Sequence, residues 1–510
     1  MKNPASIKLA LTGVGALLFN ALFWEETLGL NTLIFALFIT GGLFYIHRKE
    51  KLSNYAILMG LTTLFSAGMV VVNYSFPARL ALIISSILMI GFLHHHSLRS
   101  ILYAASGAFS SLLKVPKQLI TSVRFTENTR KEWYRGIRYV QLFVIPTIVA
   151  IVFLFIFRAA NPVFNAWTNS FFDFIGIGLE NLFTWLSPVR LIFVLLGAIL
   201  TSWAFFAIGH PKITAKEAAQ SDEVLRKRRK FTKTSAPFTA VSLKNENRTG
   251  AILMAMVSVM ATMVNAIDIS HVWFNFEYDS SMNLSQFVHE GTYLLILSIL
   301  LSMGIMLYYF RGNQNFYLKN TRIKWLAHIW IVQNVIMVIS VAIRNYHYIH
   351  YHGLAYKRIG VIFFLGLTLF GLWTLFIKIK AKKSAFFLLR TNSWATYVMV
   401  LMLASINWDL RIAEYNITHW NKAHTDVDFL LSLSDKALPI LDQHREVFIG
   451  HQVPAEKAWA NPIPATMRLD QRIQSFVDNT VHYSWLSWNW PEDKAFNHFN
   501  AQGITVSIKE

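Results

Sequence analysis

Hydrophobic residues fill eleven stretches within the first 410 positions, and polar residues gather in the connections between them. A helix needs ~20 apolar residues to cross a bilayer core of ~30 Å, because lipid offers no hydrogen-bond partners to bare backbone groups. The pattern therefore predicts an all-α, polytopic integral membrane bundle with about eleven transmembrane helices, and the shorter apolar stretch at 97–113 predicts an interfacial or re-entrant helix. We expect the spans at 6–24, 28–46, 54–73, 78–96, 138–158, 189–209, 249–267, 292–310, 325–343, 359–379 and 392–410.

Composition supports a membrane location and excludes several kinds of chemistry. Of 510 residues, 54% are hydrophobic and only 15% are charged, which leaves too little polar surface for a soluble protein of this size. The chain has no cysteine, so disulfides, thiolate metal sites and cysteine nucleophiles are excluded. It also lacks the glycine-rich phosphate loop, the His-Glu-x-x-His zinc helix and the Gly-x-Ser-x-Gly elbow. No cofactor and no catalytic residue is therefore predicted.

Most of the 47 lysines and arginines lie in alternate connections between the spans. The positive-inside rule then places the N-terminus in the cytoplasm and the C-terminus outside the membrane. The net charge of +19 follows mainly from this topology, and it favours contact with anionic lipid headgroups at the cytoplasmic face. Nucleic-acid binding is not expected, since no aromatic and basic recognition pattern accompanies the charge.

Spans and charges divide the chain into four regions. The first has four spans and a cytoplasmic interfacial segment, and the second has two spans, an aromatic outer stretch and a basic cytoplasmic loop. That loop contains the run Leu225 to Lys230, which is either a solvated stop signal or a docking site for a protein partner. The third is a five-helix bundle, and the fourth is a small, mainly helical extracytoplasmic domain. Their bounds are 1–136, 137–248, 249–410 and 411–510.

Polar residues at the outer ends of the last five spans provide the candidate site. Two arginines within fifteen residues can clamp a carboxylate or phosphate, although an arginine at a membrane rim also simply reaches for water. Asp409 ends the last span, and we expect Arg344 to be its partner on another helix. The candidate polar site comprises His289, Glu290, Arg344, Tyr348, Arg358, Asn407 and Asp409.

No metal site is predicted from the sequence. Carboxylates and imidazoles do occur near the outer ends of the spans, but their spacing is irregular and an ordinary solvated loop explains them. The consecutive histidines His94, His95 and His96 point around a helix in different directions and cannot all bind one ion. The weak metal candidates are Asp268, His271, His347 and His350.

The C-terminal region has apolar residues at helical spacing and is long enough to bury a modest core. Its three clustered tryptophans, Trp485, Trp488 and Trp490, suit either contact with the membrane surface or stacking on sugar rings.

Five patches resemble an uncharacterised family of bacterial multi-pass membrane proteins, a domain of unknown function of the 4153/4173 type. The resemblance covers roughly 140–445 and leaves 1–136 outside it. It implies a multi-pass protein of the bacterial inner membrane and supplies no activity or substrate. Lys436 stands where the pattern leads us to expect an acidic residue. The patches are Asn161-Pro-Val-Phe164, Phe287-Val-His-Glu-Gly-Thr-Tyr293, Arg344 with Tyr348, Gly353-Leu354 and Arg358, Asn407-Trp-Asp409 with Ala413-Glu-Tyr-Asn416, and Asp428-Phe-Leu430 with Leu433-Ser-Asp-Lys-Ala-Leu-Pro439.

Three functional classes remain open. A transport or channel-like protein leads, because eleven spans exceed what an anchor requires; it predicts a polar path lined by His328, Gln333, Asn334 and Arg344. The first alternative is an envelope sensor or scaffold whose outward domain passes a state to the basic loop. The second is a membrane-embedded enzyme acting on an anionic lipid-linked or envelope substrate, with His289 or Glu290 as base.

Overall fold

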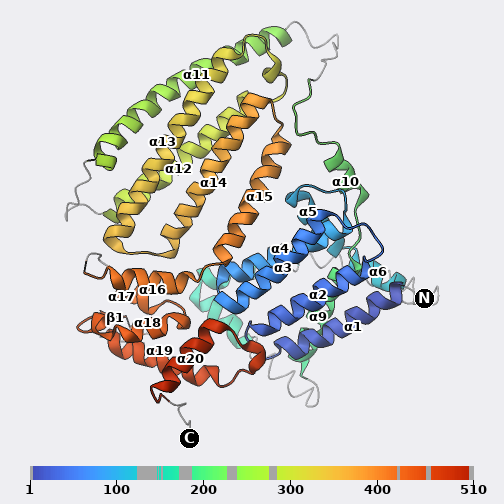
Figure 1. Ribbon diagram of the computed structural model, residues 1–510, viewed down its shortest axis with the longest axis vertical. Coiled ribbons are helices and arrows are strands. Elements are labelled where there is room, and N and C mark those ends of the chain that lie inside the picture. The colour runs from blue at the N-terminus through green and yellow to red at the C-terminus, as the bar shows by residue number, and fades with distance from the viewer. Residues whose placement is uncertain are drawn as a thin grey trace.

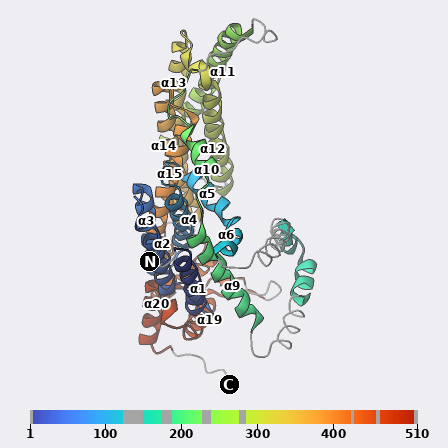
Figure 2. The same ribbon diagram turned by 90° about the vertical axis from the view of Figure 1, so that its right-hand side faces the viewer.

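The computed structural model consists of helices with one short pair of strands (Figure 1). It describes residues 4–122, 146, 149–150, 153–154, 156–171, 187–226, 238–274, 284–421, 426–454 and 461–504. Two helical bundles meet a C-terminal domain, and one set of helix ends from both bundles converges on that domain at the lower left of Figure 1. Figure 2 shows the two bundles following one another along the long axis.

The first bundle combines the N-terminal helices with two helices from the second region, α9 and α10. Serine side chains fix two of its helix starts, since Ser53 and Ser75 accept hydrogen bonds from the amides of Ala56 and Ala78. A short apolar helix, α5, packs under α4 where the sequence predicts an interfacial or re-entrant piece. The helices are α1 (Pro4–Phe23), α2 (Leu30–Ile46), α3 (Asn54–Asn73), α4 (Phe76–His94), α5 (Ile101–Leu112), α6 (Val115–Ser122), α9 (Pro188–Phe206) and α10 (Pro211–Ala218).

The second bundle is built around α13, against which α11, α12 and α14 pack. Its last helix, α15, packs on α14 and also on α3 and α4, so it joins the two bundles. Tyr397 of α15 makes this joint specific, because its hydroxyl lies 2.8 Å from that of Ser85 and donates to that of Thr62 at 2.6 Å. The helices are α11 (Phe238–Asp268) with a π-helical turn (Ile269–Phe274), α12 (Leu284–Tyr309), α13 (Thr321–His352), α14 (Tyr356–Ala381) and α15 (Ala385–Ala404).

The C-terminal domain has its own apolar core, formed by residues such as Leu430, Leu438, Leu469 and Phe499. Ile359 of α14 also belongs to that core, so the domain packs directly on the second bundle. Its elements are α16 (Trp408–Thr418), α17 (Val427–Leu431), α18 (Leu438–Gln443), α19 (Ala465–Thr480), α20 (Trp490–Ala501) and the antiparallel strands β1 (Gln452–Val453) and β2 (Ile463–Pro464).

Eight helices of the described chain are long and apolar enough to span a membrane, which makes this a multi-pass membrane protein. They correspond to eight of the eleven expected spans. Two more expected spans coincide with shorter apolar helices, Leu30–Ile46 and Tyr293–Tyr309. The remaining one, 138–158, lies largely outside the described residues.

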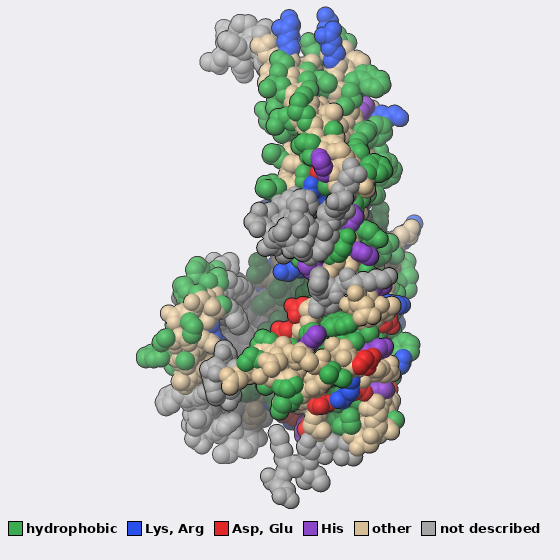
Figure 3. Space-filling view, turned by 90° about the vertical axis from the view of Figure 1, so that its left-hand side faces the viewer, with side chains coloured by type: hydrophobic (Ala, Val, Ile, Leu, Met, Phe, Trp, Pro, Cys, Tyr) green, Lys and Arg blue, Asp and Glu red, His purple; other side chains and the backbone are tan. Residues whose placement is uncertain are grey.

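The helix ends form two separate groups. At the ends opposite the C-terminal domain, the segment after α9 ties the bundles together: Asp222 pairs with Arg390 at 2.7 Å and Glu223 with Lys383 at 3.1 Å. Buried Glu217 accepts the amide of Arg99 at 3.1 Å. Figure 3 shows a largely hydrophobic surface over the helices of the second bundle, lysines and arginines at its far end, and most of the acidic residues over the C-terminal domain.

Candidate functional site

Lys436 occupies the junction of both bundles and the C-terminal domain. Its Nζ atom lies 2.7 Å from Oδ2 of Asp409, on α16, and 3.0 Å from each of the carbonyl oxygens of Asn73 and Tyr74 at the end of α3. Three acceptors therefore surround one ammonium group, whose side chain is 1% exposed. A cation at a helix C-terminus also interacts favourably with the helix dipole.

Asp409 is held ionised in this buried position. Burial raises the pKa of its carboxyl, but the charge and hydrogen bond of Lys436, together with hydrogen bonds from Tyr356 and Ser434, hold the pKa below its usual value. The hydroxyl of Tyr356, at the start of α14, donates to Oδ1 of Asp409. Asp409 thus connects α14, α16 and the segment carrying Lys436.

The expected pair of Arg344 with Asp409 is not found. Arg344 instead pairs with Asp268 at 2.5 Å, and both side chains are at most 10% exposed. This pair joins α13 to the end of α11, where the π-helical turn begins. One turn further along α13, His347 bonds to the backbone of Val272 in that turn. The sequence places Arg344 on a helix face but does not tell which neighbouring helix that face meets.

Arg358 stabilises the end of α13. Its Nη1 donates to the carbonyl oxygens of His352, at 2.8 Å, and of Gly353. Its guanidinium lies over the ring of Tyr348, 4.1 Å from the centroid. Gly353 has a φ of 78°, a conformation that favours glycine and ends the helix. The guanidinium of Arg358 thus binds backbone carbonyl groups, whereas the predicted anion clamp requires it to bind a ligand.

Asn407 and Asn416 are also occupied by structural contacts. Asn407 caps α16 by accepting the amide of Leu410. Asn416 accepts the amide of Leu354 at 2.5 Å and donates to its carbonyl at 2.9 Å, which fixes the α13–α14 turn on α16. The outer ends of the bundle and the domain are therefore joined by several directional bonds.

His289 and Glu290 lie on α12, but their side chains fall outside the described residues. Gln333, one residue of the predicted polar path, forms hydrogen bonds to α11 in the structure. The side chain of Gln333 donates to the carbonyl of Ser258 and to the hydroxyl of Thr262, and the backbone carbonyl of Gln333 accepts the side chain of Asn265. These bonds tie α13 to α11.

The described residues contain one group of three side chains with ligand atoms close enough to share a metal ion: His47, Glu50 and His96. Oε2 of Glu50 lies 2.9 Å from a ring nitrogen of each histidine, and the hydrogen bond with His47 lowers the pKa of Glu50. Hydrogen bonds alone account for this group. The weaker metal candidates do not form such a group: Asp268 pairs with Arg344, His271 is exposed, His347 bonds to Val272, and His350 stacks on Tyr346.

A cavity of about 500 Å³ lies between α1, α2, α4 and α9, and we call it the outer cavity. Arg79 and Glu26 line its end nearest the C-terminal domain, and the rest of its wall is almost entirely apolar. The buried Nε of Arg79 has no hydrogen-bond partner among the described residues, and no carboxylate of these residues forms an ion pair with this arginine. Hydropathy predicts only that a helix begins near Arg79. A single arginine just inside an otherwise uncharged span is nevertheless a signal of a functional site. The apolar wall comprises Phe19, Phe23, Leu28, Phe35, Ala36, Ile39, Leu82, Ile83, Ile90, Phe193, Leu200, Trp203 and Ala204.

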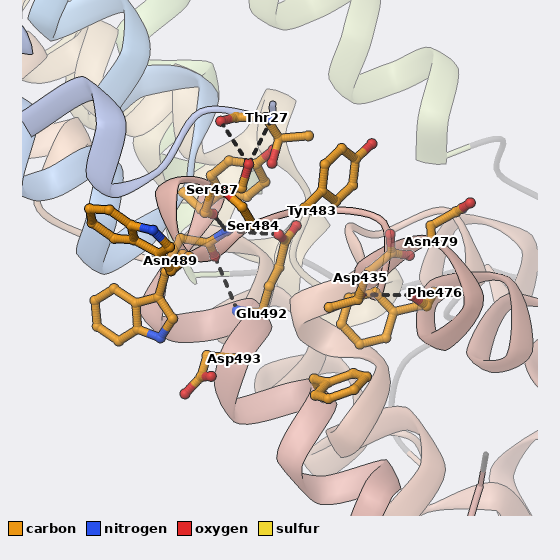
Figure 4. A pocket seen from close by; sticks show the side chains of 15 residues that line it. Thr27, Asp435, Phe476, Asn479, Tyr483, Ser484, Ser487, Asn489, Glu492 and Asp493 are labelled. Atoms are coloured by element: carbon orange, nitrogen blue, oxygen red, sulfur yellow. Dashed lines mark hydrogen bonds between the residues drawn. The ribbon is translucent and has the colours of Figure 1, made fainter. Parts of the chain in front are cut away.

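A second pocket, of about 400 Å³, lies between the C-terminal domain and the outer ends of α1 to α4, and we call it the terminal pocket (Figure 4). Glu26 links the two spaces: it lines the outer cavity, and its carboxylate accepts the hydroxyl of Ser487 and, at 3.2 Å, the amide of Ser484, which line the terminal pocket. Thr27 contributes to the terminal pocket, while Glu26 and Leu28 contribute to the outer cavity. One short loop thus borders both spaces.

A family model described as "Domain of unknown function (DUF4153)" matches residues 9–444. The resemblance stated from the sequence is confirmed, but its expected start near residue 140 is wrong, because the match includes the first four helices. Those helices carry few polar residues, which makes a resemblance there harder to recognise by eye. No curated protein and no solved structure matches the chain.

Proposed function

The chain belongs to the DUF4153 family, and from this premise we propose that this multi-pass membrane protein binds phospholipids in the outer cavity and moves them as a transporter. The observation that carries the proposal is Arg79 at the polar end of an apolar cavity. An amphiphile with one negative charge matches both parts of this space.

Arginine chemistry supports a phosphate ligand. A guanidinium presents several donors in a fixed plane and binds phosphate through paired, charge-assisted hydrogen bonds. An arginine that only extended toward solvent would keep its polar atoms hydrated. The Nε of Arg79 is instead buried and has no hydrogen-bond partner among the described residues. A volume of about 500 Å³ falls within the ~300–1,000 Å³ typical of small-molecule sites.

A second cavity supports movement rather than storage alone. It lies between α14 and α15, has a volume of about 660 Å³ and is mostly apolar; we call it the inner cavity. Arg99 and Arg390 line it, and both belong to the group of helix ends opposite the C-terminal domain; because Arg390 already pairs with Asp222, Arg99 is the phosphate ligand that we propose there. Apolar cavities with arginines at opposite ends of the helices suit the binding of phospholipid headgroups at both faces of a bilayer.

The orientation is part of the proposal. We place the N-terminus in the cytoplasm and the C-terminal domain on the periplasmic or extracellular side of a bacterial inner membrane, because the basic connections share one group of helix ends. Anionic headgroups then contact the cytoplasmic face. The basic loop remains a proposed site for a protein partner, and most of it lies outside the described residues.

The two alternatives have less support. A sensor needs a C-terminal domain that changes position, but this domain is joined to both bundles through buried Lys436 and through Asn416. An enzyme with Arg344 and Arg358 as anion ligands needs free guanidinium groups, but these two bind Asp268 and backbone carbonyls.

Lipid binding by purified protein tests the proposal. Native mass spectrometry would measure retention of phosphatidylglycerol by the wild type, by Arg79→Gln and by Ala36→Phe, which fills the outer cavity. Arg79→Gln should reduce affinity about tenfold, the loss expected for one charge-assisted hydrogen bond. Ala36→Phe should also reduce affinity, because its ring takes the space of an acyl chain. Arg411→Gln is the matched control, because Arg411 is exposed and pairs locally with Glu414. Unchanged retention in both cavity variants would refute the proposal.

A further inference from the structure

We infer that the outer cavity and the terminal pocket together select a phospholipid with an amine headgroup, whose phosphate binds Arg79 and whose ammonium enters the terminal pocket. This inference rests on the phospholipid binding proposed above and adds the class of headgroup. Such a lipid carries its negative group nearer the acyl chains and its positive group further out.

The two spaces adjoin in the matching order. The apolar outer cavity ends at Arg79 and Glu26, and the terminal pocket begins on the other side of the same loop at Thr27. Tyr74, which lines the terminal pocket, has its ring centroid 5.8 Å from the guanidinium of Arg79. From membrane to solvent the ligand would therefore meet an apolar wall, a cation and then an acidic pocket.

The lining of the terminal pocket suits an ammonium group. Three carboxylates line it, from Asp435, Glu492 and Asp493, and no lysine, arginine or histidine belongs to the lining. Asp435 is already paired with Arg472 at 2.5 Å, and Asp493 accepts the side chain of Asn497 at 3.3 Å, so we assign Glu492 as the main acceptor of the ammonium. Figure 4 shows Glu492 directed toward the group formed by Ser484 and Thr27.

Aromatic rings provide the second feature that an ammonium recognises. Tyr74, Tyr483, Trp485 and Trp488 line the same pocket, and the last three remain substantially exposed. Cations are attracted to the faces of such rings, most strongly to tryptophan. A pocket serving only as a hydrophobic rest on the membrane surface would not require the three carboxylates between these rings.

The electrostatics of Glu492 support a bound cation. Burial raises the pKa of Glu492, with a smaller contribution from the charge of Asp435, while the hydrogen bond from Asn489 and the charges of Lys436 and Arg79 oppose the rise. Arg79 is therefore within electrostatic reach of Glu492, as a phosphate and an ammonium on one short headgroup require. The two existing cations only partly offset the cost of burying this carboxylate, and an ammonium in the pocket would offset more of it.

Helix capping accounts for only one of the two carboxylate oxygens of Glu492. Asn489 caps α20 by accepting the amide of Glu492 at 3.2 Å, and it donates to Oε2 of Glu492 at 2.7 Å. Among the described residues no hydrogen-bond donor contacts Oε1. One carboxylate oxygen thus serves the cap, and the other is available to a ligand.

The test compares headgroups on identical acyl chains. Native mass spectrometry of the full chain with phosphatidylethanolamine and with phosphatidylglycerol should give the wild type about tenfold higher affinity for the amine lipid, as one charge-assisted hydrogen bond provides. Glu492→Gln should weaken binding of phosphatidylethanolamine alone and remove the difference. Arg79→Gln should weaken both lipids to a similar degree and preserve the ratio.

Two further variants keep the result interpretable. Trp485→Leu changes a side chain that is 67% exposed and leaves the cap intact, so it should also lower the preference for the amine. Glu414→Gln alters an exposed carboxylate elsewhere in the domain and should change nothing. If Arg79→Gln weakens both lipids while the ratio survives Glu492→Gln and Trp485→Leu, the headgroup inference fails alone. If Arg79→Gln weakens neither lipid, phospholipid binding itself fails.

Discussion

Lys436 and Asp409 form a buried ion pair at 2.7 Å, and the same ammonium group reaches the carbonyl oxygens that end α3. Because Asp409 also accepts the hydroxyl of Tyr356 on α14, the pair joins both helical bundles to the C-terminal domain. This junction holds the terminal pocket against the outer ends of the membrane helices.

Lys436→Met should destabilise the protein strongly. The substitution leaves the Asp409 carboxylate buried without its partner, and breaking one side of a buried pair costs ~3–5 kcal/mol. Thermal unfolding in detergent and limited proteolysis of the C-terminal domain measure the effect. Lys436→Met with Asp409→Asn should recover part of the loss, whereas Lys494→Met at an exposed position should behave as wild type. A fully stable Lys436→Met variant would contradict the role of this pair.

Acid should loosen the C-terminal domain. The pKa of Asp409 is lower in the folded protein than its ordinary value of 3.8, so its stabilising contribution is present above that value and is lost as the pH falls below it. Hydrogen exchange of α16 and of the segment around Lys436, followed from neutral pH downward, measures the loss. Asp409→Asn should be less stable at neutral pH and should lack this acid step; an identical acid profile would argue against Asp409 as its source.

Gly29→Ala should disturb the contact between the α1–α2 loop and the C-terminal domain. A Cβ atom at this position would meet the backbone of Ser487 and Trp488, where Leu30 donates to the carbonyl of Trp488 at 2.9 Å. Cysteine cross-linking between Thr27 and Ser487, introduced as a pair, measures the contact. Gly41→Ala, on the neighbouring helix with open space around it, is the matched control. Equal cross-linking in both variants would show that the loop does not need the glycine.

Arg358→Gln should lower stability without changing lipid binding. Arg358 binds the carbonyl oxygens of His352 and Gly353, so its loss exposes the end of α13 and should cost ~1–3 kcal/mol. Lys357→Gln, at the exposed adjacent position, is the control. The paired readouts are the unfolding temperature and native mass spectrometry with phosphatidylglycerol. Weaker lipid binding with unchanged stability would restore the anion-clamp interpretation of this arginine.

The membrane fold follows from hydropathy, whereas most side-chain partners do not. The period and length of the hydrophobic stretches predict the helices, because each span must form its own backbone hydrogen bonds in lipid. They do not predict which helices are neighbours, and so Arg344 is assigned Asp409 as partner from the sequence but binds Asp268 in the structure. Lys436 is seen in the sequence only as a departure from an expected acidic residue, since the two carbonyl groups that it binds at the end of α3 lie over 300 positions away.

The outer cavity is also invisible in the sequence. Its apolar wall comes mainly from α1, α2, α4 and α9, and each of these helices contributes ordinary apolar residues. Arg79, a charged residue just inside a hydrophobic span, is the one sign of the cavity in the sequence. Its significance depends on the space beside it, which the sequence does not show. A binding site that forms only when helices pack together can be recognised only once the arrangement of those helices is known.

The most direct test of the account is a cryo-electron microscopy map of the protein in nanodiscs of phosphatidylethanolamine and phosphatidylglycerol. We predict elongated density in the outer cavity between α4 and α9, with its phosphate beside Arg79, and loss of that density in Arg79→Gln. An outer cavity that is closed by side chains, or lipid density that ends away from Arg79, would contradict the account.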